Sequence, residues 1–148
     1  MLSAPCAAHG AGDADLCFAT AAEQQDAMAA GTTTAKALTR LYLARIKAVD
    51  SAGPRLRSVI EVNPEAVSIA AALDTERRAT GARGPLHGVA VLLKDNVDTG
   101  DDMHTTAGSL ALVDSIPLGD ATIVTKLRAA GAVILGATPG RQYVLYHD

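Results

Sequence analysis

The sequence predicts an α/β fold in which a helical lead-in is followed by a partly parallel sheet. Two observations carry this prediction. The first half of the chain places apolar residues at helical spacing, and the second half contains two continuous apolar runs, 89–93 and 132–135, separated by one helix-forming stretch. A strand, a crossover helix and a second strand make a βαβ unit, whose two strands run parallel.

The elements of the lead-in follow in order along the chain. Residues 1–20 are aperiodic and rich in Ala and Gly, which predicts a loosely ordered extension. A short helix is expected at 21–30, ending at Gly31. A second helix follows, and its apolar face consists of residues at helical spacing: Leu38, Leu41, Tyr42, Ile46 and Val49.

A short strand is expected at 58–62, followed by a third helix. Asn63 is the predicted N-cap of that helix and Pro64 its first residue, with an end near Gly81.

The βαβ unit comes next. The run 89–93 predicts a strand that is covered on both faces. A polar loop then reaches about Ser109, Asp120 is the expected cap of the crossover helix, and that helix ends at Gly131 before the strand at 132–135.

Composition excludes several classes of function. The 148 residues are 49% hydrophobic and 20% charged, with a net charge of −3, as in an ordinary one-domain globular protein. No basic stripe alternates with aromatic residues, so no nucleic-acid partner is expected. The chain lacks a secretory signal and a membrane-length apolar stretch, so we expect a cytoplasmic protein without a membrane partner.

Cysteine and histidine usage gives no indication of a metal. Cys6 and Cys17 are expected to be unpaired thiols of a reducing compartment. None of the four histidines lies at metal-ligand spacing, and no phosphate-binding glycine motif is present. We therefore expect no metal and no cofactor.

Lys94 is the residue whose position points to chemistry. It directly follows an apolar run, at the carboxyl end of the predicted strand, where open α/β sheets bind ligands. Leu92, Leu93 and Val97 are expected to desolvate it in part, and lost hydration favours the neutral amine that a base needs. Spacing alone still favours a structural role, because a lysine that ends a strand usually extends into water.

The residues around Lys94 change that balance. Residues 84–99, GPLHGVAVLLKDNVDT, closely resemble the GPLHGIPVLLKDNIDT segment of the amidase-signature family, and the resemblance continues through MHTTAGSLAL and LRAAGAVILG. It covers about residues 20 to 138. We therefore expect 21–138 to be the N-terminal portion of an amidase domain, and 139–148, where resemblance stops, to be a divergent and non-native tail.

The resemblance implies hydrolysis of an amide by a Ser–cis-Ser–Lys triad. Lys94 would be the base that, through a bridging serine, activates a second serine to attack the carbonyl of a small-molecule amide. Backbone N–H groups of a glycine-rich loop would stabilise the oxyanion. The match favours a general amidase over a component of a tRNA-dependent amidotransferase, and it leaves the amide class and the oligomeric state open.

Only part of that machinery is present. Ser109 and Ser115 are the only serines after Lys94, and neither lies in a glycine/serine-rich run. We expect an incomplete copy, shortened by a frameshift, an early stop or an artificial boundary, that is inactive alone. The alternative is a non-catalytic assembly fragment that requires a complementary chain. A small enzyme using a Ser109–Lys94 dyad is disfavoured, because the dyad would lack an oxyanion loop.

Other residues near Lys94 have weaker assignments. His87 and His104 are expected to be packing or loop residues. Asp95 and Asn96 either orient the lysine or act as ordinary turn residues after a strand. The loop expected to lie beside substrate contains Thr105, Thr106, Gly108 and Ser109.

Overall fold

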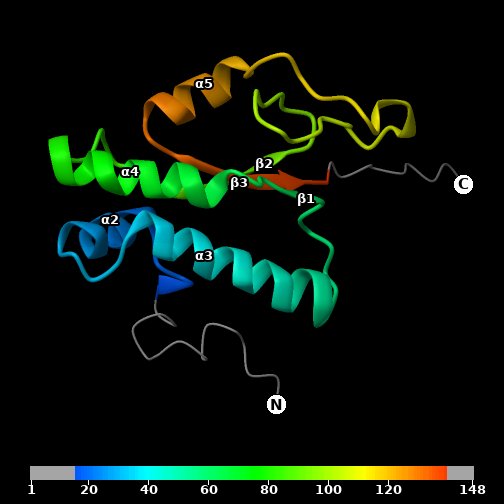
Figure 1. Ribbon diagram of the computed structural model, residues 1–148. Helices are drawn as coiled ribbons and strands as arrows, with labels where there is room; N and C mark the ends of the chain where they lie inside the picture. Colours follow the sequence, from blue (N-terminus) through cyan, green and yellow to red (C-terminus); the bar gives the residue numbers. More distant parts are fainter. Residues whose placement is uncertain (1–15, 140–148) are drawn as a thin grey trace, which may run out of the picture.

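The computed structural model describes residues 16–139, so most of the predicted N-terminal extension and of the divergent tail lie outside it. The described chain forms three layers, with α2, α3 and α4 on one face of a small sheet and α5 on the other (Figure 1). The elements in chain order are α2 (Ala21–Ala29), α3 (Ala35–Arg45), the π-helix η2 (Ile46–Ala52), β1 (Glu61–Val62), α4 (Ala66–Thr80), β2 (Ala90–Lys94), the 3-10 helix η3 (Leu110–Leu112), α5 (Thr122–Ala129) and β3 (Val133–Thr138).

The start of α3 is fixed by two separate acceptors. The hydroxyl of Thr34 accepts from the backbone N–H of Ala37 at 3.1 Å. The carboxylate of Asp74, which belongs to α4, accepts from the backbone N–H groups of Ala35 and Lys36 at 2.7 and 3.0 Å. Three of the four N–H groups that a helix start leaves unpaired are thereby satisfied, and two of the bonds tie α3 to α4.

The predicted second helix is present but changes character before its end. From Ile46 it widens into η2, whose last bond runs from the N–H of Gly53 to the carbonyl of Ala48 at 2.8 Å. The carboxylate of Asp50, on the inner side of this turn, accepts from the backbone N–H and hydroxyl of Ser58. The segment that leads to β1 is therefore held against the end of the helix.

Helix α4 begins at Ala66, so the prediction of Asn63 as its N-cap and Pro64 as its first residue is wrong. The Asn63 side chain is buried and has other partners. Its oxygen accepts from the backbone N–H of Glu65 at 2.9 Å, and its amide nitrogen donates to the carbonyl of Ile134 in β3 at 2.9 Å. Asn63 thus joins the chain before α4 to the central strand, and the helix starts after that junction.

The sheet has the strand order β1–β3–β2 and confirms the predicted βαβ unit. β2 and β3 are parallel, from Ala90 opposite Val133 to Lys94 opposite Thr138, with a shift in register after Val91. β1 is antiparallel to β3 and much shorter than the predicted 58–62 strand. β3 approaches β1 so closely at Gly136 that a Cβ there would clash with the carbonyl oxygen of Glu61.

Burial differs sharply between the two predicted core strands. β3 is central and buried along nearly its whole length. β2 is an edge strand of the described sheet, and Leu92 on it is 40% exposed. The expectation of a strand covered on both faces is therefore wrong for the run 89–93, because Leu92 lines a cavity between β2, α3 and η2.

Two further predictions are corrected. Asp120 does not cap α5, because its carboxylate accepts from the N–H of Gly100 at 2.7 Å and from Nε of Arg128 at 2.9 Å. Cys17 is disulfide-bonded rather than an unpaired thiol, and Cys6 lies outside the described residues. Within 16–139, no helix has both the length and the apolar character needed to cross a bilayer.

Candidate functional site

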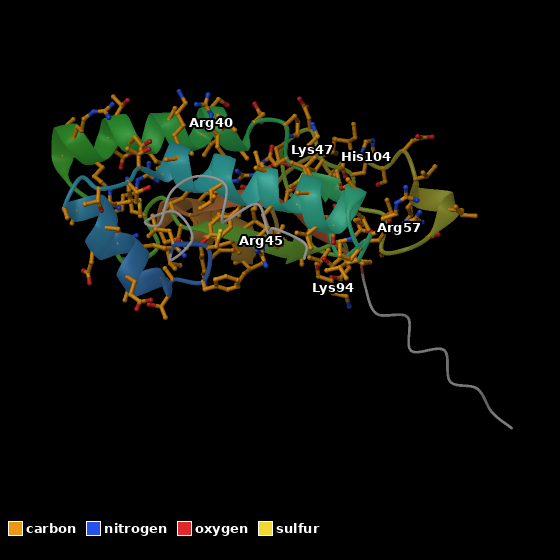
Figure 2. The ribbon with its side chains drawn as sticks, turned by 90° about the horizontal axis from the view of Figure 1, so that it is seen from below. Arg40, Arg45, Lys47, Arg57, Lys94 and His104 are labelled. Atoms are coloured by element: carbon orange, nitrogen blue, oxygen red, sulfur yellow. The ribbon has the colours of Figure 1, made fainter. Side chains whose placement is uncertain are left out.

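Lys94 occupies the expected position at the carboxyl end of β2, opposite Thr138 of β3. It is exposed and lies toward the same end of the molecule as Arg57 and His104 (Figure 2). The predicted partial desolvation by Leu92, Leu93 and Val97 is therefore not found. Leu92, two residues before Lys94, is itself 40% exposed and lines a cavity between β2, α3 and η2.

Asp95 anchors the backbone that follows Lys94. Its own N–H donates to the carbonyl of Thr138 at 2.9 Å, and its carbonyl accepts from Ala107 at 2.9 Å. Its carboxylate accepts from both the backbone N–H and the hydroxyl of Thr106. Asp95 is only 2% exposed. The sequence left two roles open for Asp95, orienting the lysine or forming an ordinary turn. A turn alone does not explain these contacts with Thr106, Ala107 and Thr138.

The loop of Thr105, Thr106, Gly108 and Ser109 is folded back beside β2 by these bonds. Ala107 and Gly108 both have positive φ, 49° and 77°, and the N–H of Ser109 donates to the carbonyl of Thr106 at 2.8 Å. Ala107 is strained in this region, where a Cβ is disfavoured. The Ser109 hydroxyl accepts from the N–H of Ala111 and so caps η3.

A cavity of about 270 Å³ lies beside this loop. Asp95, Thr106, Gly108 and Ser109 line one side of it, and Ile60 contributes from the chain before β1. The structure thus brings three of the four predicted loop residues together around one hollow at the carboxyl end of the sheet.

His104 and Glu61 form a contact that the sequence did not indicate. The backbone N–H and Nδ1 of His104 each lie 2.8 Å from a different carboxylate oxygen of Glu61. The bond and the negative charge of Glu61 raise the pKa of His104 above its usual value. The two residues are 43 positions apart, and no local motif relates them, so this pair could be found only from the fold.

His87 has a structural role. Its ring is fully buried, Nδ1 accepts from the N–H of Arg83 at 3.3 Å, and Nε2 lies 3.0 Å from the carbonyl of Leu73. Nε2 therefore carries the proton and donates it to that carbonyl. The ring joins the GPLHG segment to α4.

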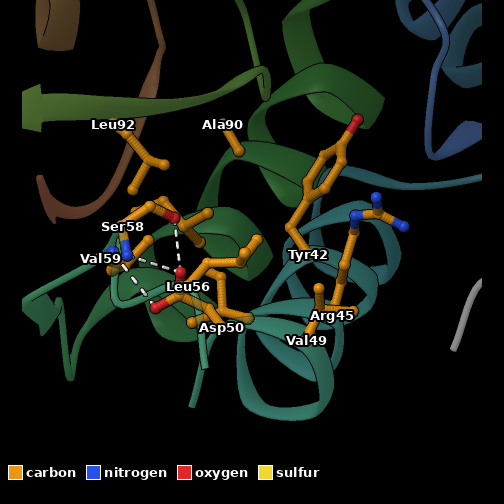
Figure 3. A pocket seen from close by; sticks show the side chains of 11 residues that line it. Tyr42, Arg45, Val49, Asp50, Leu56, Ser58, Val59, Ala90 and Leu92 are labelled. Carbon is orange, nitrogen blue, oxygen red and sulfur yellow. Dashed lines mark hydrogen bonds between the residues drawn. The ribbon is translucent and has the colours of Figure 1, made fainter. Parts of the chain in front are cut away.

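A larger cavity, of about 370 Å³, lies between α3, η2 and β2, away from the loop (Figure 3). Its walls are mostly apolar, with Tyr42 and Leu56 facing Ala90 and Leu92, and the bonded Asp50–Ser58 pair at one end. A mostly apolar hollow beside an exposed edge strand is typical of a packing surface. Within residues 16–139, no group of three or more His, Cys, Asp or Glu side chains is arranged to hold a metal ion.

The family model for Amidase matches residues 37–146. A putative amidase of Arthroderma benhamiae is 43% identical over 72% of this chain, and a glutamyl-tRNA(Gln) amidotransferase subunit from Chloroflexus aurantiacus is 42% identical over 79%. The chain spans 18% and 23% of those proteins.

Solved structures agree with the sequence comparison. The native peptide amidase of Stenotrophomonas maltophilia superposes with a TM-score of 0.79 at 51% identity, over 82% of this chain and 24% of that one. An amidase family protein of Bacillus anthracis gives a TM-score of 0.80 at 39% identity, over 84% and 25%. The match of the family model to most of the chain shows that this protein belongs to the amidase family.

Proposed function

We propose that the chain supplies the base of an amide hydrolase, and that Lys94 is that base. The observation that carries the proposal is the place of Lys94, at the carboxyl end of β2 and directly before the anchored Asp95 and its loop. A neutral lysine amine there would accept a proton, through a bridging serine, from a nucleophilic serine. That serine would attack the amide carbonyl, the amine would leave, and water would release the acid.

The two serines of this mechanism have no counterpart in the 148 residues. The Ser109 hydroxyl is engaged in capping η3, and Ser115 is the only other serine after Lys94. We propose that the chain alone does not turn over an amide, and that hydrolysis requires a polypeptide that brings a glycine/serine-rich loop to Lys94.

Exposed apolar surface supports a second candidate, a non-catalytic assembly fragment that binds a complementary chain. Among residues 16–139, β2 has no strand beside its outer edge, and the segment after the loop carries exposed apolar side chains, including Leu110 at 89% and Leu118 at 108%. Such a surface is typical of an interface. The two candidates differ only in whether Lys94 takes part in chemistry once the complex has formed.

The substrate class that we propose is a small-molecule amide. The 51% identity to a peptide amidase, against 42% to the amidotransferase relative, favours a general amidase over a tRNA-dependent enzyme.

The test combines the purified chain with a separately produced downstream portion of an amidase relative that carries the serine loop. We expect amide hydrolysis and fluorophosphonate labelling only in the mixture. Lys94→Ala should lower the rate of hydrolysis by at least about 100-fold, as expected when a general base is removed. Lys126→Ala, an exposed lysine on α5, is the matched control and should keep full activity. Complex formation with equal hydrolysis by Lys94→Ala would favour the assembly candidate.

A separate outcome would revive the small-enzyme hypothesis. If the chain alone is labelled at Ser109 and the labelling disappears in Lys94→Ala, a local dyad operates and the need for a second polypeptide is refuted.

The cytoplasmic location stays a prediction, and one finding opposes it. Cys17 is disulfide-bonded, and disulfides persist mainly in oxidising compartments. Alkylation of free thiols in intact cells before lysis would decide the matter: modification of Cys17 supports the cytoplasm, and protection until a reductant is added supports an oxidising compartment.

A further inference from the structure

Four attachments hold the loop 103–109 to the rest of the molecule, and one of them is a bond from the backbone N–H of Thr105 to the carbonyl of Ser115 at 2.9 Å. The side chain of Met103 is buried in the core cluster beneath α5, at 1% exposure. Thr106 and Ala107 are bonded to Asp95. The remaining attachment is the His104–Glu61 pair, and it alone joins the loop to β1, on the far side of β3 from β2.

The position of Glu61 links this pair to Lys94 through the sheet. Glu61 is paired with Ala137 of β3, and the next residue, Thr138, is paired with Lys94. Three adjacent backbone segments therefore connect the glutamate to the proposed base. Because both carboxylate oxygens are used, one by the backbone N–H and one by Nδ1 of His104, the pair fixes the position of the loop backbone as well as the ring.

We propose that Glu61 and His104 are positioning residues for the site at Lys94: they hold the loop 103–109 against β1, and the hold is strongest while His104 is protonated. The positioning role in catalysis rests on the proposed function. The pH-dependent attachment of the loop to β1 does not depend on whether any amide is hydrolysed.

Two acidic groups act on His104. Glu61 faces it from β1, and Asp114, on the segment after η3, adds a smaller attraction to the imidazolium. Both raise the pKa of His104 above its ordinary value of 6.5. A raised pKa means that the stabilisation is fully present below the ordinary value and is lost as the pH rises through the value in the folded protein. The loop should therefore be held at mildly acidic pH and loosened at alkaline pH.

The backbone part of the attachment does not titrate. The N–H of His104 donates to Glu61 at every pH at which the carboxylate is ionised, so the loop should loosen without detaching. The expected change is a factor of roughly two to five in local opening, the range for a partly exposed ion pair.

The experiment is amide hydrogen exchange by NMR on the full 148-residue chain. The reporters are the N–H groups of Thr106, Ala107 and Ser109, which are bonded within the site. Protection factors, corrected for the intrinsic pH dependence of exchange, should fall roughly two- to fivefold between about pH 6 and about pH 9. The midpoint should coincide with the titration of the His104 ring, measured in the same samples.

Two variants test the pair from its two sides. Glu61→Gln should lower the titration midpoint of His104 and reduce loop protection at pH 6, and His104→Gln should keep the backbone bond but remove the pH dependence. Glu76→Gln is the matched control, because it breaks a comparable exposed pair with Arg83 away from the loop, and it should change neither quantity.

The proposal is overturned if loop protection in the unmodified chain does not change across the His104 titration. It is also overturned if Glu61→Gln changes loop protection and the His104 midpoint no more than Glu76→Gln does. Failure of the proposed function would look different. In that case Lys94→Ala would have no effect on hydrolysis by the completed enzyme, while the pH-dependent protection of the loop would be unchanged.

Discussion

Replacement of the buried Asp74 by alanine should be among the most damaging single changes to a helix start in this protein. Asp74 belongs to α4, yet its carboxylate satisfies the first two N–H groups of α3, at Ala35 and Lys36. The local cap, Thr34, reaches only the N–H of Ala37. Removal of Asp74 therefore leaves two donors of the first turn without their acceptor and also breaks the link between two helices.

The magnitude follows from burial. Asp74 is 8% exposed and Ala35 is fully buried, so water cannot freely replace the lost carboxylate. Loss of a capping acceptor costs about 1 kcal/mol, and a buried donor left unpaired adds about 1 to 2 kcal/mol. We expect Asp74→Ala to lower the free energy of unfolding by about 2 to 3 kcal/mol, which corresponds to a fall of about 5 to 10 °C in Tm for a chain of this size.

Urea denaturation followed by far-ultraviolet circular dichroism measures this change. Asp74→Asn keeps one acceptor oxygen and loses the charge, so it should cost about 1 kcal/mol. Thr34→Ala, at an exposed cap with one long bond, should cost about 1 kcal/mol or less. If Asp74→Ala is no more destabilising than Thr34→Ala, the Asp74 carboxylate does not stabilise the start of α3 as the geometry indicates.

Three further changes test separate parts of the structure. Gly136→Ala should destabilise by about 3 kcal/mol or more in the same urea assay, because the new methyl group would clash with the carbonyl oxygen of Glu61 in the paired strand. Ser58→Ala should raise the carboxyl titration midpoint of Asp50, measured by carbon NMR, because the hydroxyl bond is the main cause of its lowered pKa. The stability that this bond contributes is present above the ordinary pKa of an aspartate, and it is lost as the pH falls through the lowered pKa of Asp50 in the folded protein. Lys94→Ala should change the free energy of unfolding by less than about 0.5 kcal/mol, because Lys94 is exposed.

The controls for these changes are specific. Gly119→Ala introduces the same methyl group where no atom lies within 4 Å, and it should be nearly neutral. An Asp50 midpoint that does not move in Ser58→Ala would show that the backbone bonds alone lower its pKa. A loss of more than about 1 kcal/mol in Lys94→Ala would show that this side chain stabilises the fold, and any loss of activity could then not be assigned to chemistry.

The sequence predicted the elements whose patterns are local. The helix of α2, the apolar face of α3, the end of α4 at Gly81 and the parallel βαβ unit all follow from periodicity and glycine positions within short windows. The errors concern side chains that bond across the fold. Asn63 and Asp120 are residue types that often cap helices, but Asn63 accepts from Glu65 before α4 and donates to β3, and the carboxylate of Asp120 bonds to Gly100 and Arg128.

The site shows the same division. The position of Lys94 at a strand end could be predicted, because it depends on the apolar residues that directly precede it. The Asp95–Thr106 bonds and the His104–Glu61 pair could not, because they join residues 11 and 43 positions apart through loop and sheet geometry. The sequence predicts a site at this strand end, and the fold shows which residues bond its loop to β1 and to the end of β2.

The exposure of Lys94 bears directly on its proposed role. The apolar run before it has the composition of a strand buried on both faces, yet Leu92 is 40% exposed and Lys94 is open to solvent. A lysine that acts as a base needs its neutral amine, and loss of hydration favours that form. If Lys94 is the base, as we propose, we expect its desolvation to come from a complementary polypeptide that packs against β2, an edge strand of the described sheet. Such packing would cover Leu92, give the outer edge of β2 a hydrogen-bonding partner and favour the neutral amine of Lys94. Assembly of the complex and activation of the proposed base would then be a single event.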